Sequence, residues 1–231
     1  MNDLFRESVY FGFFLALAAY WIGLKIQKRF SYTICNPLLL CTILIVIVLT
    51  AFHIDYDTFD QGAKYITYFL TPSTVCLAIP MYKQIQVLKK NLAAILISLV
   101  SGCIAAAFTI WALCAIFGLD AMIYHSLQPK SITTAIAMGV SEELGGNPTL
   151  TVAAVIITGL FGGIAAKTVC RLFRITNPIA VGLACGNSAH AIGTSKALEF
   201  GEVEGAMSSL AVVTAGVITV VLAPMFAGLI P

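Results

Sequence analysis

The chain has 231 residues, of which 59% are hydrophobic and only 10% are charged. About a quarter of the residues in a soluble globular domain are charged, so this composition excludes a soluble fold. Thirteen Lys and Arg against eleven Asp and Glu leave a formal charge of +2. No basic run is dense enough to follow a phosphate backbone, which argues against a nucleic-acid partner.

Uncharged apolar runs predict where the chain crosses the membrane, because a helix needs about 20 mostly apolar residues to span the hydrocarbon core. In chain order these runs are 8–24, 30–54, 65–82, 91–119, a short piece at 131–141, 144–166, 175–195 and 205–231. The pattern predicts an all-α polytopic membrane protein. We expect a single membrane domain over residues 1–231, with approximate halves 1–119 and 120–231.

Basic residues predict the orientation, because Lys and Arg concentrate in cytoplasmic loops. Nine of them follow the first, third and 144–166 segments: Lys25, Lys28, Arg29, Lys83, Lys89, Lys90, Lys167, Arg171 and Arg174. This bias places the N-terminus in the periplasm. It is consistent along the chain only if residues 126–146 enter and leave the membrane on the outer side, so we expect a re-entrant segment there. The alternative is a full eighth span.

The spacing of Asn-Pro pairs and helix-breaking residues predicts an internal repeat. Asn-Pro opens apolar segments at Asn36, Asn147 and Asn177, as an N-cap followed by proline in the first helical turn. An interval of about 111–114 residues relates the two halves, joining Asn36 to Asn147, Pro72 to Gly186, and Asn91 to Gly205. Each half then has a span, an interrupted span and a span in opposite orientation, which is the inverted repeat of many secondary transporters.

The first polar cluster within the membrane is Thr71-Pro72-Ser73-Thr74. Proline removes a backbone donor and breaks the third segment into halves, so Ser73 and Thr74 become candidates for a polar binding pocket. The alternative is a simple proline kink whose freed carbonyls are satisfied by the neighbouring hydroxyls.

The second cluster is Pro129-Lys130-Ser131-Ile132-Thr133-Thr134. A half-helix that starts here would offer free N–H groups and a positive dipole end, beside the Lys130 ammonium and the hydroxyls of Ser131 and Thr133. This combination suits a small carboxylate. Alternatively, Lys130 extends to the outer lipid headgroups and binds no solute.

The third cluster, residues 182–196, is rich in Gly, Asn, Ser and His. Small residues permit close backbone approach, and amides or hydroxyls satisfy the backbone groups of an unwound crossing. Asn187 is therefore a candidate hydrogen-bond donor to a solute. His190 titrates in the physiological range and is a candidate proton carrier, or else a neutral histidine bonded to a neighbouring helix.

Motifs of enzymes and cofactor sites are lacking in the sequence. It has no nucleophile elbow, no His-Glu-x-x-His and no phosphate loop, so we expect neither an enzyme nor a bound cofactor. The seven cysteines are an odd number scattered through apolar segments without a Cys-x-x-Cys pair, which argues against a disulfide framework and a metal site.

The three clusters together resemble the signature blocks of the LrgB/CidB family of bacterial inner-membrane proteins, and the length fits its short YohK-like members. The resemblance rests on residues 71–82, 129–146 and 186–194 and extends over nearly the whole chain. Family members are described as antiholin-like regulators of murein hydrolase export and lysis that act with a small LrgA/CidA-like membrane partner. A plastid relative carries glycolate and glycerate, and some bacterial pairs are linked to pyruvate uptake.

The residues and the resemblance together predict a secondary transporter of small monocarboxylates in the bacterial inner membrane. Its expected ligand is a small organic anion, held between the interrupted helices of an inverted-repeat bundle. The expected binding residues are Ser73, Thr74, Lys130, Ser131, Thr133, Asn187 and His190. The alternative function is the antiholin-like regulator with its small partner, and a homo-oligomer is compatible with either.

Overall fold

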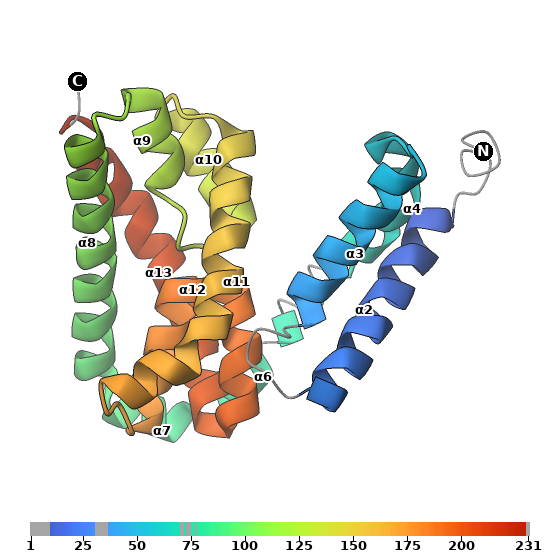
Figure 1. Cartoon of the computed structure of the whole chain (residues 1–231). Coiled ribbons are helices and arrows are strands. Elements are labelled where there is room, and N and C mark those ends of the chain that lie inside the picture. Colours follow the sequence, from blue (N-terminus) through green and yellow to red (C-terminus); the bar gives the residue numbers. More distant parts are fainter. Residues whose placement is uncertain (1–9, 31–36, 70–71, 73–74, 77, 230–231) are drawn as a thin grey trace. The chain divides into compact units, whose positions relative to one another are not determined.

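Figure 1 shows a computed structural model of the protein, which describes residues 10–30, 37–69, 72, 75–76 and 78–229. Every regular element in these ranges is a helix. Among the described residues, α8 (Leu92–Phe117), α11 (Pro148–Leu172) and α13 (Glu202–Ala227) are long and apolar enough to cross a membrane. The predicted all-α membrane protein is therefore confirmed.

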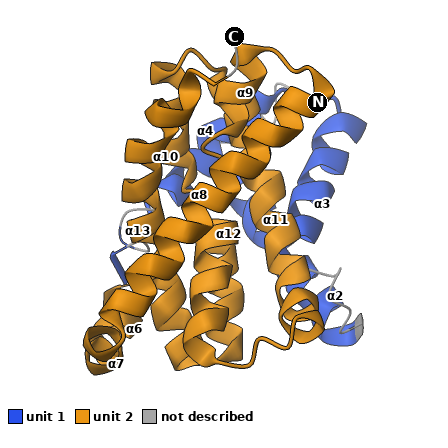
Figure 2. Ribbon diagram, turned by 90° about the vertical axis from the view of Figure 1, so that its left-hand side faces the viewer, with its two compact units in different colours: residues 1–76 blue, residues 77–231 orange. Residues whose placement is uncertain are grey.

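The chain divides into two compact units, residues 1–76 and 77–231 (Figure 2). The first contains α2 (Phe11–Phe30), α3 (Pro37–Ala51) and α4 (Tyr56–Thr67). Glycines on α2 let the other two helices pack closely, because a Cβ at Gly12 would overlap the Phe59 carbonyl of α4, and one at Gly23 would lie 2.8 Å from the Pro37 carbonyl oxygen of α3. The expected halves, 1–119 and 120–231, stay a prediction.

The predicted third span, residues 65–82, is not one helix. Helix α4 begins in the charged segment before it and ends at Thr67, and the next longer helix, α6 (Ala78–Lys83), begins beyond Pro72. The predicted interruption at the proline and hydroxyl cluster stays a prediction, because Thr71, Ser73 and Thr74 lie outside the described residues. The bounds of the span were wrong, because the amphipathic α4 uses Asp57, Asp60 and Lys64 on its polar side and does not start at the uncharged run.

The second unit contains the three long helices together with shorter ones at both ends. Helices α6 and α7 (Ile85–Lys90) lie at one end, and α9 (Ala121–Leu127) and α10 (Thr134–Glu143) lie at the other (Figure 1). Between α11 and α13 runs α12 (Pro178–Phe200). The predicted Asn-Pro helix starts are confirmed at α11 and α12, where the Asn147 and Asn177 side chains accept hydrogen bonds from first-turn N–H groups, while Asn36 lies outside the described residues.

Helices α9 and α10 form a hairpin that enters and leaves the bundle at the same end (Figure 1). Its turn, residues 128–133, reaches far enough inward for Ile132 to pack with Cys103 and Ala215, which lie near the middle of α8 and α13. A helix of 10 residues spans about 15 Å, half of the hydrocarbon thickness. The predicted re-entrant segment is therefore present, and the alternative of a full eighth span is excluded.

The buried hydroxyl of Thr151, near the start of α11, forms hydrogen bonds with this hairpin. The Thr151 hydroxyl lies 3.0 Å from the Ser126 carbonyl oxygen of α9 and 2.7 Å from the Ser141 hydroxyl of α10. The backbone N–H of Asn147 donates to the Ser126 hydroxyl over 2.7 Å. The two bonds of Thr151 are buried, so they replace hydrogen bonds that water would otherwise make, and the bond from Asn147 is partly buried.

Helix α12 also reverses direction, although its hydrogen bonding is helical on both sides of the reversal. Ala189 has φ −134° and ψ 18°, and His190 has φ 42° and ψ −135°, so neither residue is helical. Beyond them the chain folds back: a Cβ at Gly193 would overlap the Cys185 carbonyl, and Val181 and Ala197 belong to one buried cluster. In a straight helix Val181 and Ala197 would be about 24 Å apart.

Because α12 is a hairpin, its two ends lie at the same end of the bundle as α6 and α7 (Figure 1). The sequence left open whether residues 175–195 cross the membrane or re-enter it, and the structure gives them the form of a hairpin. The interruption itself was expected, but it lies at Ala189–His190 and not at Gly186. Gly186 remains helical and instead lets the first half of α12 approach the Ser208 carbonyl of α13.

A hairpin followed by a long helix thus occurs twice in the second unit, in opposite directions. The α9–α10 hairpin and α11 start from one end, and the α12 hairpin and α13 start from the other (Figure 1). This inverted arrangement lies within the second unit and is not the repeat between the two halves that the sequence predicts. The predicted repeat at about 111–114 residues joins the first unit to the second and stays a prediction.

The hairpin form of α12 predicts the labelling of introduced cysteines. In a background without the native cysteines, Thr176→Cys and Glu202→Cys should react with a membrane-impermeant thiol reagent from one side, and Glu142→Cys from the other. All three positions are exposed. Comparing intact cells with inverted vesicles measures this, and labelling of positions 176 and 202 from opposite sides would show that α12 crosses the membrane.

Candidate functional site

The two hairpins approach each other from opposite ends of the second unit and both reach the region of Val155 on α11. Ile132 of the α9–α10 turn and Val155 belong to one buried cluster. His190, at the reversal of α12, makes a 3.0 Å hydrogen bond between its Nε2 and the Val155 carbonyl oxygen. The ends of four short helical segments are therefore gathered in the interior of the bundle, where each end has backbone groups without a helical partner.

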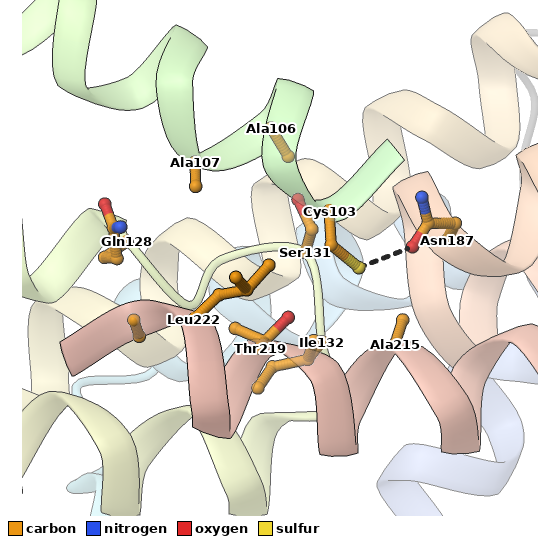
Figure 3. Close-up of a pocket in the computed structure, with 11 residues that line it drawn as sticks. Cys103, Ala106, Ala107, Gln128, Ser131, Ile132, Asn187, Ala215, Thr219 and Leu222 are labelled. Atoms are coloured by element: carbon orange, nitrogen blue, oxygen red, sulfur yellow. Dashed lines mark hydrogen bonds between the residues drawn. The ribbon is translucent and has the colours of Figure 1, made fainter. Parts of the chain in front are cut away.

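A small cavity lies beside the meeting point of the hairpins, between α8 and α13 (Figure 3). Its volume of about 20 Å³ accommodates about one water molecule. The lining residues come from α8, the α9–α10 turn, α12 and α13: Cys103, Ala106, Ala107, Gln128, Ser131, Ile132, Asn187, Ala215, Thr219, Leu222 and Ala223. Most are apolar, and the polar ones are uncharged amides, hydroxyls and one thiol.

Asn187 closes one end of the cavity and connects the α12 hairpin to α8 (Figure 3). Its Oδ1 accepts a hydrogen bond from the Cys103 thiol over 3.3 Å. Its Nδ2 lies against Gly102, where a Cβ would overlap it. Asn187 therefore fits because α8 has a glycine at this position, and its amide is held at the cavity wall.

Ser131 lies between the two ends of the cavity and brings a positive charge close to it (Figure 3). The half-buried Lys130 lies next to it in the turn, and its ammonium donates a 3.4 Å hydrogen bond to the Ser131 hydroxyl. The adjacent Thr133 is the N-cap of α10 and contributes no side-chain cap. The first N–H groups of α10 and the Lys130 charge together make this turn favourable for an anion.

Gln128 lies at the other end of the cavity from Asn187 (Figure 3). It is only 4% exposed, and neither Oε1 nor Nε2 has a hydrogen-bond partner among the described residues. The nearby Tyr124 hydroxyl donates to the Phe226 carbonyl oxygen over 2.8 Å, and its oxygen can also accept a hydrogen bond from Nε2 of Gln128. A fully buried amide without partners is unusual, because each unsatisfied group costs about 1–3 kcal/mol.

His190 points away from the cavity lining and packs on α11. It is 5% exposed, and its bond to a carbonyl requires a proton on Nε2. Its φ of 42° with ψ of −135° belongs to a region that non-glycine residues rarely adopt. Gly159 of α11 makes room for the imidazole, since a Cβ there would lie 2.6 Å from the ring. In this structure His190 holds the hairpin against α11, and its role as a proton carrier stays a prediction.

The structure brings only some of the predicted binding residues to the cavity. Ser131 and Asn187 line it, Lys130 contacts it through Ser131, and Thr133 follows in the same turn. Ser73 and Thr74 lie outside the described residues. Their roles in binding stay predictions. Among the residues that the structure describes, no group of three or more His, Cys, Asp or Glu could hold a metal ion.

Sequence reasoning missed Gln128, Cys103 and Thr219 as lining residues. Gln128 was visible as an uncharged polar residue directly before Pro129 in the second cluster. Thr219 is one of several hydroxyl residues in the apolar run 205–231, and Cys103 is one of several scattered cysteines. Nothing in their local sequence separates them from ordinary helix-packing residues.

Comparison with known proteins gives one consistent result. The chain matches the LrgB-like family over residues 16–229. Proteins named "Antiholin-like protein LrgB" from Bacillus mycoides (strain KBAB4), Bacillus cereus (strain B4264) and Bacillus anthracis (strain CDC 684 / NRRL 3495) are each 38% identical over 218 residues, which cover 94% of this chain and 95% of the relative. No solved structure matches the chain significantly.

The contact between His190 and Gly159 predicts the effect of one added methyl group. Gly159→Ala should displace the α12 reversal and lower the free energy of unfolding by about 1–3 kcal/mol, because the tightly packed interior has no room for it. Gly139→Ala on α10 is the control, since a Cβ there meets nothing within 4 Å. Thermal unfolding in detergent measures both, and an unchanged midpoint for Gly159→Ala would contradict this packing.

Proposed function

The chain belongs to the LrgB-like family, and we propose that it is a secondary transporter of small monocarboxylates of the glycolate, glycerate or pyruvate type. The observation that carries the proposal is the meeting of two oppositely directed hairpins at a cavity inside the bundle whose mostly apolar lining includes amides and hydroxyls. Broken helices are tolerated at membrane depth only where protein or a water-filled cavity surrounds them. Carriers use such breaks, in inverted pairs, to bind substrates near the midplane.

An anionic solute would find complementary groups on one side of this cavity. The Lys130 ammonium supplies charge through its contact with Ser131, and the Asn187 amide supplies hydrogen bonds from the opposing hairpin. A carboxylate in an apolar bundle without a countercharge would be very costly. The single lysine next to the lining therefore supports an anion as the solute.

Alternating access requires the hairpins to move, since the cavity holds about one water molecule and a short acid is several times larger. The α12 hairpin packs closely on α13, where the Thr194 and Ser208 hydroxyls are hydrogen-bonded over 2.9 Å. It meets α8 through the Cys103 thiol, and its Leu183 shares a buried cluster with Ile95 and Leu99 of α8. Because the cavity lies between α8 and α13, we infer that the α12 hairpin and α13 move together relative to α8 when the solute enters.

The charges at the two ends of the second unit support an orientation in the bacterial inner membrane. The end with α6 and α7 carries Lys83, Lys89, Lys90, Lys167, Arg171 and Arg174, and the end with α9 and α10 carries Asp120, Glu142 and Glu143. By the positive-inside rule, the basic end is cytoplasmic. The same rule, applied to the basic residues after the first segment, places the N-terminus in the periplasm.

A second candidate function is favoured by the names of the relatives. They are called antiholin-like, and none of these names mentions transport. In this alternative the chain regulates murein hydrolase export and lysis together with a small LrgA/CidA-like membrane protein. The comparisons support this alternative better than transport, whereas the paired hairpins and the cavity between α8 and α13 support transport.

Uptake of labelled short acids into proteoliposomes that contain the full chain tests the transport proposal. Asn187→Leu and Ser131→Ala should each lower uptake about tenfold, because each removes a hydrogen bond that the solute needs. Ser101→Ala is the control, as its exposed hydroxyl bonds only to the Ser98 carbonyl of the same helix.

No uptake of any short acid, with or without a co-reconstituted small LrgA/CidA-like protein, would contradict transport. If deletion of the chain then changed the rate of cell lysis, the regulatory function would remain.

A further inference from the structure

A second and larger cavity lies at the end of the second unit that carries α6 and α7 (Figure 1). Its volume of about 200 Å³ is about ten times that of the cavity between α8 and α13. The lining residues come from α6, the turn after it, the end of α12 and the start of α13: Ile79, Pro80, Lys83, Gln84, Leu198 and Glu202. The cavity therefore opens where helices end, at the level of the lipid headgroups.

Lys83 and Glu202 bring opposite charges to this cavity. Within the described part of the chain, neither side chain forms an ion pair or a hydrogen bond, whereas Lys196 and Glu199 of α12 are paired with each other. The two charges of the lining cancel. A simple anion would meet the Glu202 carboxylate, and a simple cation would meet the Lys83 ammonium. The lining therefore suits a ligand with one negative and one positive group.

The remaining walls of the cavity are largely apolar. Ile79 and Leu198 line it and are exposed, and Tyr82 is exposed beside Lys83 at the end of α6. Aromatic and basic residues at helix ends are typical of the membrane interface. A ligand of this cavity thus meets hydrocarbon surface and charge together, which a phospholipid supplies through its acyl chains and its headgroup.

We propose that this cavity binds a phospholipid whose zwitterionic headgroup ends in a primary ammonium, as in phosphatidylethanolamine. Lys83 binds the phosphate, Glu202 accepts hydrogen bonds from the ammonium, and the acyl chains lie along Ile79 and Leu198. Because α6 packs on α13, the lipid joins two elements that are already in contact. This inference does not depend on the proposed transport function.

The two charged residues also predict which phospholipids are disfavoured. Phosphatidylcholine carries a quaternary ammonium, which has no N–H group to donate to Glu202. Phosphatidylglycerol has a phosphate for Lys83 but no cation, so its negative charge would lie near the Glu202 carboxylate. Phosphatidylethanolamine alone of the three offers a partner to both side chains.

Native mass spectrometry of the purified full chain in detergent tests the proposal. The three lipids are added in turn, each with the same oleoyl chains, and the bound lipid is measured. We expect phosphatidylethanolamine to bind about fivefold more tightly than either of the others, as one partly exposed ion pair with hydrogen bonds contributes. Equal binding of the three lipids would overturn the inference.

Two variants assign the preference to the cavity. Glu202→Gln should remove the preference for phosphatidylethanolamine over phosphatidylglycerol, and Lys83→Gln should weaken the binding of both. Glu142→Gln and Lys167→Gln are the matched controls, because these residues are exposed and do not line the cavity. Binding like that of the wild type in both cavity variants would show that the lipid binds elsewhere.

Soluble phosphoethanolamine distinguishes the lipid from a free solute with the same headgroup. An excess of it should leave phosphatidylethanolamine bound, because it lacks the acyl chains that contact the apolar walls. Displacement of the lipid would assign the cavity to a soluble zwitterion and would overturn the proposed lipid site.

Discussion

The structure depends on one constraint, which is that backbone N–H and C=O groups inside a membrane must be satisfied within the protein. The second unit places two hairpin turns in its interior, at the level of the middle of α8 and α13. Neither turn could face lipid. The hydroxyls of Thr151, Ser126 and Ser141 at one hairpin, and the bond from His190 to Val155 at the other, take the place of the missing helical bonds and of water.

Small residues make the second hairpin possible because they let backbones approach closely. Gly182 and Gly186 put the first half of α12 against the α13 backbone, Gly193 brings its two halves together, and Gly159 accommodates His190. These contacts leave little freedom around α12 on the α11 and α13 sides. On the α8 side, Asn187 contacts Gly102 and Cys103, and Leu183 shares a buried cluster with Ile95 and Leu99. The small residues therefore let the hairpin pack on all three neighbouring helices.

The site attracts an anion on one side and excludes charge from its other walls. Lys130 and the start of α10 favour an anion at the α9–α10 turn, while the apolar walls from α8 and α13 exclude charge elsewhere. Gln128 adds a buried donor and acceptor that the protein leaves unpaired. The relatives are named antiholin-like, whereas the groups at the cavity indicate a preference for an anionic solute. A carrier is tested by measuring solute flux, and a regulator of lysis is tested by measuring the rate of cell lysis.

The sequence by itself determined the membrane class, the long helices α8, α11 and α13, the Asn-Pro starts of α11 and α12, and the re-entrant 126–146 segment. Hydrophobic length, capping and charge bias are local properties that a single chain displays. Only the tertiary structure decided that α12 turns back, because a straight and a folded helix have the same local hydrogen bonding and differ in the contacts of Val181 with Ala197. The place of Gln128 was likewise undecided, since its burial and missing partners depend on α8 and α13, which lie far from it in sequence.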